Sequence, residues 1–216
     1  MSQAAILIDS AGPCVAVAAL SKEKGEFCES ARIVAGADGW LTPQLARALS
    51  HVGNESFRLG VATGPGAFTG IRVGLAHALG LAMARGIEVT PISSLAIRAS
   101  FAAGQKRVLA ILDGKKGRVY AQHFDTRGPV PVALDEPRDI EPARLAPGNG
   151  VAVGEGAIAF SELLMVAGYS IAQQAGNMPF DCAFTLLFAG TSAPPDRVFP
   201  AYLREPDATP PPGVGT

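Results

Sequence analysis

The residues best suited to chemistry form a glycine-rich stretch, Gly64-Pro65-Gly66-Ala67-Phe68-Thr69-Gly70. It lies between an apolar segment typical of a strand and one typical of a helix, where backbone N–H groups can bind an anion. It is not a Walker A loop, because no Lys-Ser/Thr pair follows the glycines, and its third glycine comes one residue too late for a dinucleotide fingerprint. A tight structural turn is therefore the alternative interpretation. The candidate nucleotide or anion site comprises Asp9, Gly64, Gly66, Thr69 and Gly70.

Two aspartates stand where an apolar segment meets a turn. Asp9 follows Ile6-Leu7-Ile8, and Asp113 follows the segment 109–112. In a phosphotransferase, an aspartate in this position can hold Mg²⁺. Capping of the turn explains the same pattern, and we favour that interpretation.

The other residues that could do chemistry do not form a catalytic set. The three histidines, His51, His77 and His123, have neither HxxxH nor HExxH spacing. The sequence has no GxSxG motif, and none of its three cysteines lies in a nucleophile signature. We therefore predict no catalytic residue and no metal site in this chain.

Composition and charge narrow the class of protein. The 216 residues are 48% hydrophobic and 17% charged, the reverse of the balance in a disordered chain. The net charge of −1 lacks the basic surplus of a free-standing nucleic-acid binder, so any contact with RNA should run through a partner. The first twenty residues contain Asp9 and no basic region, which predicts neither a signal peptide nor a membrane span. We predict a cytoplasmic protein.

Hydrophobic periodicity predicts an α/β chain with two similar halves. In the first half we expect strands over residues 4–8, 14–20, 27–34, 58–63 and 88–92, and helices over 42–52, 71–85 and about 93–103. In the second half we expect strands over 107–112, 118–124 and 151–154, and helices over 157–167 and 184–189. Thr42 is the expected N-cap of the first helix, and Ser93 or Ser94 that of the third.

One pattern occurs in both halves. An apolar strand, an aspartate, a short turn and a second strand recur 104 residues apart, at Asp9 and at Asp113. The recurrence predicts a duplicated, two-lobed architecture. Chance similarity between two hairpins is the alternative.

The helix expected over residues 71–85 is apolar nearly all round, so both of its faces should be covered. Gly70, Gly74 and Ala78 recur every four residues, and Gly80 and Ala84 form a second such line. Small residues at this spacing let another helix approach closely. Burial within the lobe is one interpretation, and a face kept for a partner subunit is the other. The helix over 42–52 could lie beside it.

Several segments, in order along the chain, resemble the TsaB (YeaZ-like) family. They are the residues 6–10, the stretch GPGAFTGIRVG at 64–74, Ser93-Ser94-Leu95, the second hairpin at 113–120, and PAYLR at 200–204. The pattern GPG-x-FTG-x-R-x-G is specific, and the resemblance extends roughly over residues 4–205. It implies two ribonuclease-H-like lobes of the actin-like, sugar-kinase and Hsp70 ATPase class.

The resemblance also implies a domain division and a function. The N-terminal lobe with its dimerisation helices would span residues 1–104, a reduced C-terminal lobe 105–205, and a Pro-rich tail, expected to be disordered, 206–216. The family acts in making N6-threonylcarbamoyladenosine (t6A) at position 37 of tRNAs that read ANN codons. Its members are not enzymes on their own. They pair with the catalytic paralogue TsaD, whose HxxxH motif binds the metal, and an ATPase, TsaE, joins the complex.

Further expectations concern partners and ligands. The resemblance implies contact with tRNA only through the complex, no tightly bound cofactor, and room for ADP or ATP with Mg²⁺ at the interface within the complex. The isolated chain is expected to be able to form a homodimer. Because family members pair through N-lobe helices, the candidate partner interface comprises Thr42, Leu45, Leu49, Gly70, Arg72, Gly74 and Ala78.

The chain departs from the family pattern at three places, and two other functions stay open. Asp38-Gly39-Trp40 replaces a His-Ser or His-Thr pair, Arg118 stands where an acidic residue is common, and the second lobe is short between Gln173 and Pro200. The alternatives are a glycopeptidase-like metalloprotease of the M22 type and a small-molecule kinase of the same fold. The kinase would use Asp9, the 64–70 loop and Mg²⁺.

Overall fold

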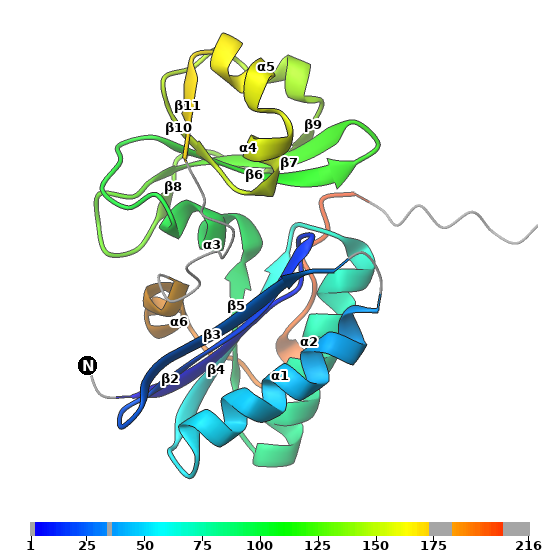
Figure 1. Cartoon of the computed structure of the whole chain (residues 1–216), viewed down its shortest axis with the longest axis vertical. Coiled ribbons are helices and arrows are strands. Elements are labelled where there is room, and N and C mark those ends of the chain that lie inside the picture. The colour runs from blue at the N-terminus through cyan, green and yellow to red at the C-terminus, as the bar shows by residue number, and fades with distance from the viewer. Residues whose placement is uncertain (1–2, 34–35, 173–182, 205–216) are drawn as a thin grey trace, which may run out of the picture.

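The computed structural model describes residues 3–33, 36–172 and 183–204. These residues form two α/β lobes, each built on its own sheet, and Figure 1 shows the lobes one above the other with α3 (Ser94–Ser100) between them. Neither sheet could bury its apolar faces alone, so each is covered by helices.

The first lobe has a five-stranded sheet in the order β3-β2-β1-β4-β5. Strand β1 pairs antiparallel with β2 and parallel with β4, as in a hairpin extended by a crossover. The strands are β1 (Ala4–Asp9), β2 (Cys14–Ser21), β3 (Gly25–Arg32), β4 (Phe57–Gly64) and β5 (Val89–Ser93).

Helices cover both faces of this first sheet. The helices α1 (Ala37–Val52) and α2 (Phe68–Arg85) lie side by side on one face, and α6 (Phe184–Ala189) lies on the other (Figure 1). Alternation along the strands explains the division, because successive side chains point to opposite faces. A Cβ on Gly60 would lie 2.8 Å from Leu187 of α6 and 3.2 Å from Leu7, whereas Ile8 approaches Gly74 of α2.

The second lobe has a six-stranded sheet in which the path is β11-β10-β6-β7-β8 and β9 also pairs with β7. Its two faces again alternate by residue. Leu109 and Ile111 of β6 pack with α4 (Glu155–Ala159) and α5 (Ser161–Val166), while Val108 and Ala110 pack with α3. The strands are β6 (Val108–Lys115), β7 (Arg118–Asp125), β8 (Val132–Ala133), β9 (Arg138–Ile140), β10 (Gly150–Val153) and β11 (Tyr169–Ile171), with the 3₁₀ turn η1 (Pro142–Arg144) before β10.

Two predicted helix boundaries are wrong. Helix α1 begins at Ala37, so Thr42 lies inside it, where its hydroxyl is 3.1 Å from the carbonyl of Asp38, and Thr42 is not an N-cap. The helix expected over 157–167 is divided into α4 and α5 at Phe160, whose φ of −119° is not helical. The predicted cap of α3 is confirmed, because the Ser93 hydroxyl accepts a hydrogen bond from Ala96 N–H.

The segment from Ala183 to Val198 packs with the first lobe. Its apolar side chains join the core around β1 and β4, and Arg58 of β4 donates hydrogen bonds to the carbonyls of Phe188 and Gly190 at 2.9 and 2.8 Å. The sequence assigned these residues to the C-terminal lobe (105–205), so their contacts differ from that assignment. The boundary near residue 104 stays a proposal, and the expected Pro-rich tail (206–216) lies outside the described residues.

Within the described ranges, the structure contains no helix that is both long and apolar enough to cross a membrane.

Candidate partner interface and the inter-lobe cluster

Helix α2 carries one buried line of small residues and one exposed line. Gly74 and Ala78 face inward, and a Cβ on Gly74 would lie 2.3 Å from the Ser10 hydroxyl. Gly80 is exposed and would meet nothing within 4 Å, and the neighbouring Met83 is 74% exposed. The outer face of α2 therefore presents small and apolar groups to solvent, with the exposed Arg72 on the same face: Ala76, Gly80, Met83 and Ala84.

The residues predicted to form the partner interface differ in their exposure in the same way. Thr42 and Arg72 are exposed, and Leu49 and Gly70 are partly buried. The side chains of Leu45, Gly74 and Ala78 are buried inside the lobe, so a partner cannot reach them in this structure. The spacing of four fits both lines of small residues equally, so it does not by itself show which line points outward.

Helix α1 is fixed beside α2 by a hydrogen-bonded histidine. The Nδ1 atom of His77 lies 2.9 Å from the carbonyl of Val73, and since a carbonyl can only accept, Nδ1 carries the proton. The Nε2 atom lies 3.0 Å from the Thr42 hydroxyl of α1. Thr42 and His77 thus hold the two helices together at the edge of the candidate interface, which we define as the outer faces of α1 and α2.

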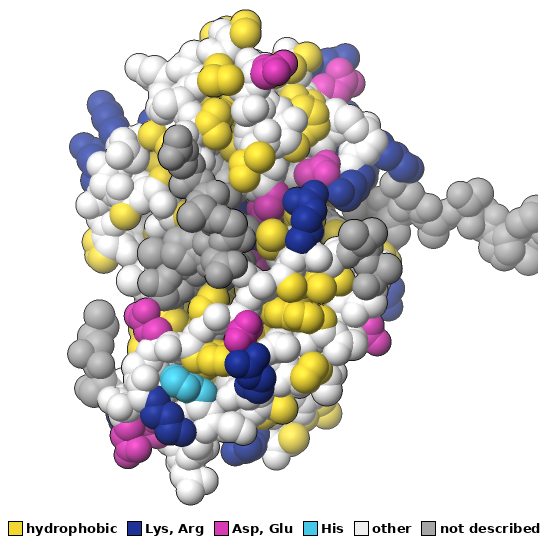
Figure 2. Space-filling view, viewed as in Figure 1, with side chains coloured by type: hydrophobic (Ala, Val, Ile, Leu, Met, Phe, Trp, Pro, Cys, Tyr) yellow, Lys and Arg dark blue, Asp and Glu magenta, His cyan; other side chains and the backbone are white. Residues whose placement is uncertain are grey.

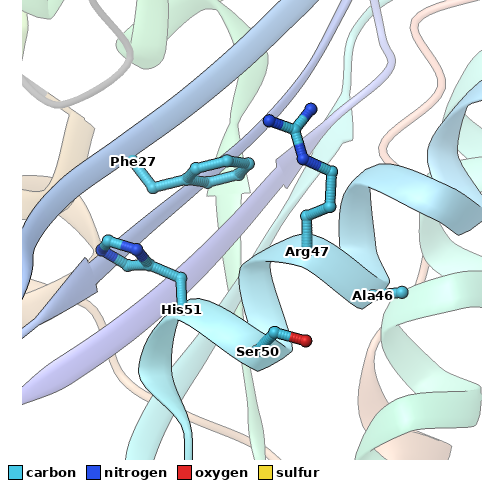
Figure 3. A pocket seen from close by; sticks show the side chains of 5 residues that line it. All are labelled: Phe27, Ala46, Arg47, Ser50 and His51. Atoms are coloured by element: carbon cyan, nitrogen blue, oxygen red, sulfur yellow. The ribbon is translucent and has the colours of Figure 1, made fainter.

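A shallow hollow lies on the other side of α1, against β3 (Figure 3). The Arg47 guanidinium stands 5.3 Å from the Phe27 ring centroid and 2.9 Å from the Glu29 carboxylate. His51 Nε2 lies 3.0 Å from the carbonyl of Gly25. These contacts join α1 to β3, and they explain the hollow as a by-product of helix docking.

The glycine-rich loop packs against the turn that follows β1. A Cβ on Gly66 would lie 2.3 Å from the carbonyl oxygen of Ala11, and one on Gly70 would lie 2.1 Å from that of Ser10. Ala67 N–H donates to the same Ala11 carbonyl at 2.7 Å, and the Ser10 hydroxyl donates to Gly70 at 2.7 Å. The glycines are thus required for close approach of two backbones. These contacts favour the structural turn over a phosphate-binding loop.

Gly70 and Gly80 provide a matched test within one helix. Gly70→Ala should lower the free energy of unfolding by about 2–3 kcal/mol, because the new methyl group overlaps a backbone oxygen. Gly80→Ala should raise it by about 0.5–1 kcal/mol, because alanine restricts the unfolded chain and meets no neighbour. Urea unfolding curves measure both effects. Equal stability of the two variants would show that the loop does not pack as described.

A charged cluster lies between the two lobes. Arg98 of α3, with a fully buried side chain, forms an ion pair with Asp9 at the end of β1. On its other side, Nη2 and Nε of Arg98 donate to the two carboxylate oxygens of Glu155 at 2.8 and 3.1 Å. Asp9 also accepts a hydrogen bond from Ala11 N–H at 2.9 Å. The cluster therefore links strand β1 of the first lobe to helix α4 of the second.

The electrostatics of this cluster follow from burial and pairing. Burial raises the pKa of the Asp9 carboxyl, and Arg98 opposes that shift. Burial alone would lower the pKa of Arg98, but Asp9 and Glu155 outweigh it and raise that pKa. Arg98 is therefore a permanent cation. Because it neutralises Asp9, this aspartate does not fit the metal-binding role considered for a phosphotransferase.

Three comparisons with known proteins bear on this arrangement. The profile of the family described as "TsaD: tRNA N6-adenosine threonylcarbamoyltransferase" matches residues 40–130. The "tRNA threonylcarbamoyladenosine biosynthesis protein TsaB" of Escherichia coli K12 is 28% identical over 156 residues, covering 65% of this chain and 68% of its own length. YeaZ from Pseudomonas aeruginosa has a similar structure, with a TM-score of 0.80 and 24% identity over 94% of this chain and 100% of its own.

The two helix-covered sheets and the likeness to YeaZ define the class: a two-lobed protein with the actin-like, ribonuclease-H-like fold. The fold predicted from the sequence is thereby confirmed. Together, the likeness to TsaB, the likeness to YeaZ and the match to the TsaD profile support membership in the TsaB/YeaZ family.

Proposed function

We propose that this chain is a non-catalytic subunit required for the formation of t6A at position 37 of tRNAs that read ANN codons. Support comes from its likeness to the biosynthesis protein TsaB of E. coli. It would act by pairing with a catalytic paralogue of the TsaD type. A TsaE-type ATPase would join the complex. The chain would reach tRNA only through the complex, consistent with its net charge of −1 and with the face in Figure 2, on which Lys and Arg are interspersed with Asp and Glu.

The observation that carries the pairing is the outer face of α2. Gly80 and its small neighbours give a helix surface on which a second helix can approach closely, and Met83 adds a flexible apolar contact. Small and apolar residues gathered on one exposed helix face suit an interaction site. The adjacent α1, tied to α2 through Thr42 and His77, extends the surface. The same face would serve a homodimer of the isolated chain.

The residue types support the non-catalytic role. The sequence lacks the HxxxH pair with which the catalytic paralogue binds its metal. The Asp9 carboxylate, the candidate for phosphotransfer, is bound to Arg98, and the glycine loop is packed against Ser10 and Ala11. If ADP or ATP with Mg²⁺ takes part, we place it at the interface with the paralogue.

The experiment combines capture with a measurement of the modified nucleoside. The tagged chain, expressed at its native level, should co-purify with the TsaD-type protein in equal amounts. Depletion of the chain should lower t6A in total tRNA, measured by mass spectrometry of nucleosides, and re-expression should restore it. Normal t6A after complete removal of the chain, in cells without a second copy of the gene, would refute the proposal.

A further inference from the structure

Arg98 occupies a place between two carboxylates that come from different lobes. Asp9 ends β1 in the first lobe, and Glu155 begins α4 in the second. Asp9 binds Nη1 of the guanidinium and Glu155 binds Nη2 and Nε, so the two acids stand on adjacent sides of one small cation. Without a cation between them, two carboxylates this close and this buried could not both be ionised.

The backbone on both sides of the cluster approaches the side chains of Arg98 and Glu155 closely. A Cβ on Gly12 would lie 2.5 Å from Oε1 of Glu155 and 2.8 Å from Nη2 of Arg98. A Cβ on Gly154 would lie 3.1 Å from the Arg98 side chain and 2.3 Å from the carbonyl of Ile111. Glycine at both positions lets the backbones of the two lobes approach the guanidinium and exclude water from it.

We propose that Asp9 and Glu155 form an inter-lobe cation site whose cation is the guanidinium of Arg98, supplied by the chain itself. The planar fork of an arginine satisfies both carboxylates at once and cannot be lost by dilution or deprotonation. Arg98 thus fastens the lobes in one arrangement and keeps a free divalent cation out of the space between them. This inference does not depend on the partner or on t6A.

The chemistry of the two acids defines what could replace Arg98. Hard divalent cations such as Mg²⁺ and Mn²⁺ are held by one or two carboxylates and complete their shell with water. In the described part of the chain no group of three or more His, Cys, Asp or Glu side chains converges, so the site is this pair of carboxylates and its bound guanidinium. Truncating Arg98 would leave both acids and a space for a hydrated ion.

The test is cation binding by the full chain with and without the guanidinium. In Arg98→Ala we expect one equivalent of Mn²⁺ to bind, observed by titration calorimetry and by loss of the free-ion electron paramagnetic resonance signal. At an excess of about 100-fold over the dissociation constant, Mn²⁺ should raise the melting temperature of this variant by about 5 °C or more. The wild-type chain should show neither effect.

A double variant tests whether the carboxylates hold the Mn²⁺ ion. Arg98→Ala combined with Glu155→Gln should lose the Mn²⁺ equivalent and the thermal shift. If Arg98→Ala is unfolded without metal, recovery of its native circular dichroism on refolding with Mn²⁺ supports the proposal. Two results overturn it: an Arg98→Ala chain that gains neither binding nor stability from any divalent cation, or a wild-type chain that binds Mn²⁺ at a site lost in Asp9→Asn.

Discussion

Gly80→Arg should weaken pairing with the TsaD-type paralogue by about 100-fold or more and leave the chain folded. Nothing lies within 4 Å of a Cβ at this position, so the arginine extends into solvent in the free chain. Arginine also favours a helix more than glycine does, so the free energy of unfolding should not fall. In the complex, the same side chain would separate the helices and bury an unpaired charge, and 100-fold corresponds to about 2.7 kcal/mol.

The control places the same charge on another exposed helical position. Ala159 in α4 of the second lobe is exposed, and Ala159→Arg should pair as the wild type does. Dissociation constants from biolayer interferometry, together with melting temperatures, separate binding from folding. If Gly80→Arg binds within threefold of the wild type, the outer face of α2 is not the interface.

Arg98→Met should lower the free energy of unfolding by about 3–5 kcal/mol, the range for breaking a buried ion pair on one side. The loss arises because Asp9 and Glu155 would remain buried without their cation. The change removes little volume, so packing contributes a small part. Chemical unfolding followed by circular dichroism measures the effect.

The matched variant removes all three charges together. A chain with Asp9→Asn, Arg98→Met and Glu155→Gln buries no unpaired charge, so it should recover most of the loss, to within about 1–2 kcal/mol of the wild type. If this triple variant were as unstable as Arg98→Met, the penalty would come from packing around Arg98, and the electrostatic explanation would be wrong.

The sequence predicted the elements well because their signals are local. The apolar runs of β1 and β6, the cap at Ser93 and the strand–aspartate–turn pattern at Asp9 and again at Asp113 each depend on residues close in the chain. The resemblance to the TsaB family rests on equally local motifs. Each of these features could be assigned without knowing what packs against what.

Orientation and long-range pairing could not be predicted. Helix α2 is apolar nearly all round, and Gly74 and Gly80 both belong to lines of small residues four apart, so this spacing did not distinguish the buried line from the exposed one. Glu155 lies 57 residues from Arg98 and in the other lobe, so no spacing rule connects them. One signal was available: Arg98 is the single charged residue in the apolar segment 94–103, and a lone charge there requires a buried partner.

The return of the segment 183–198 to the first lobe has a consequence for synthesis. Helix α6 covers a face of the first sheet, and the bridge between Val89 and Ala193 extends its edge. On the ribosome, residues 4–93 therefore emerge long before the part of the chain that covers them, although domains ordinarily fold in order from the N-terminus. The face of the first sheet that packs against Leu187 stays uncovered until the second lobe has been synthesised. The first lobe thus reaches its final packing only after the second lobe has been synthesised.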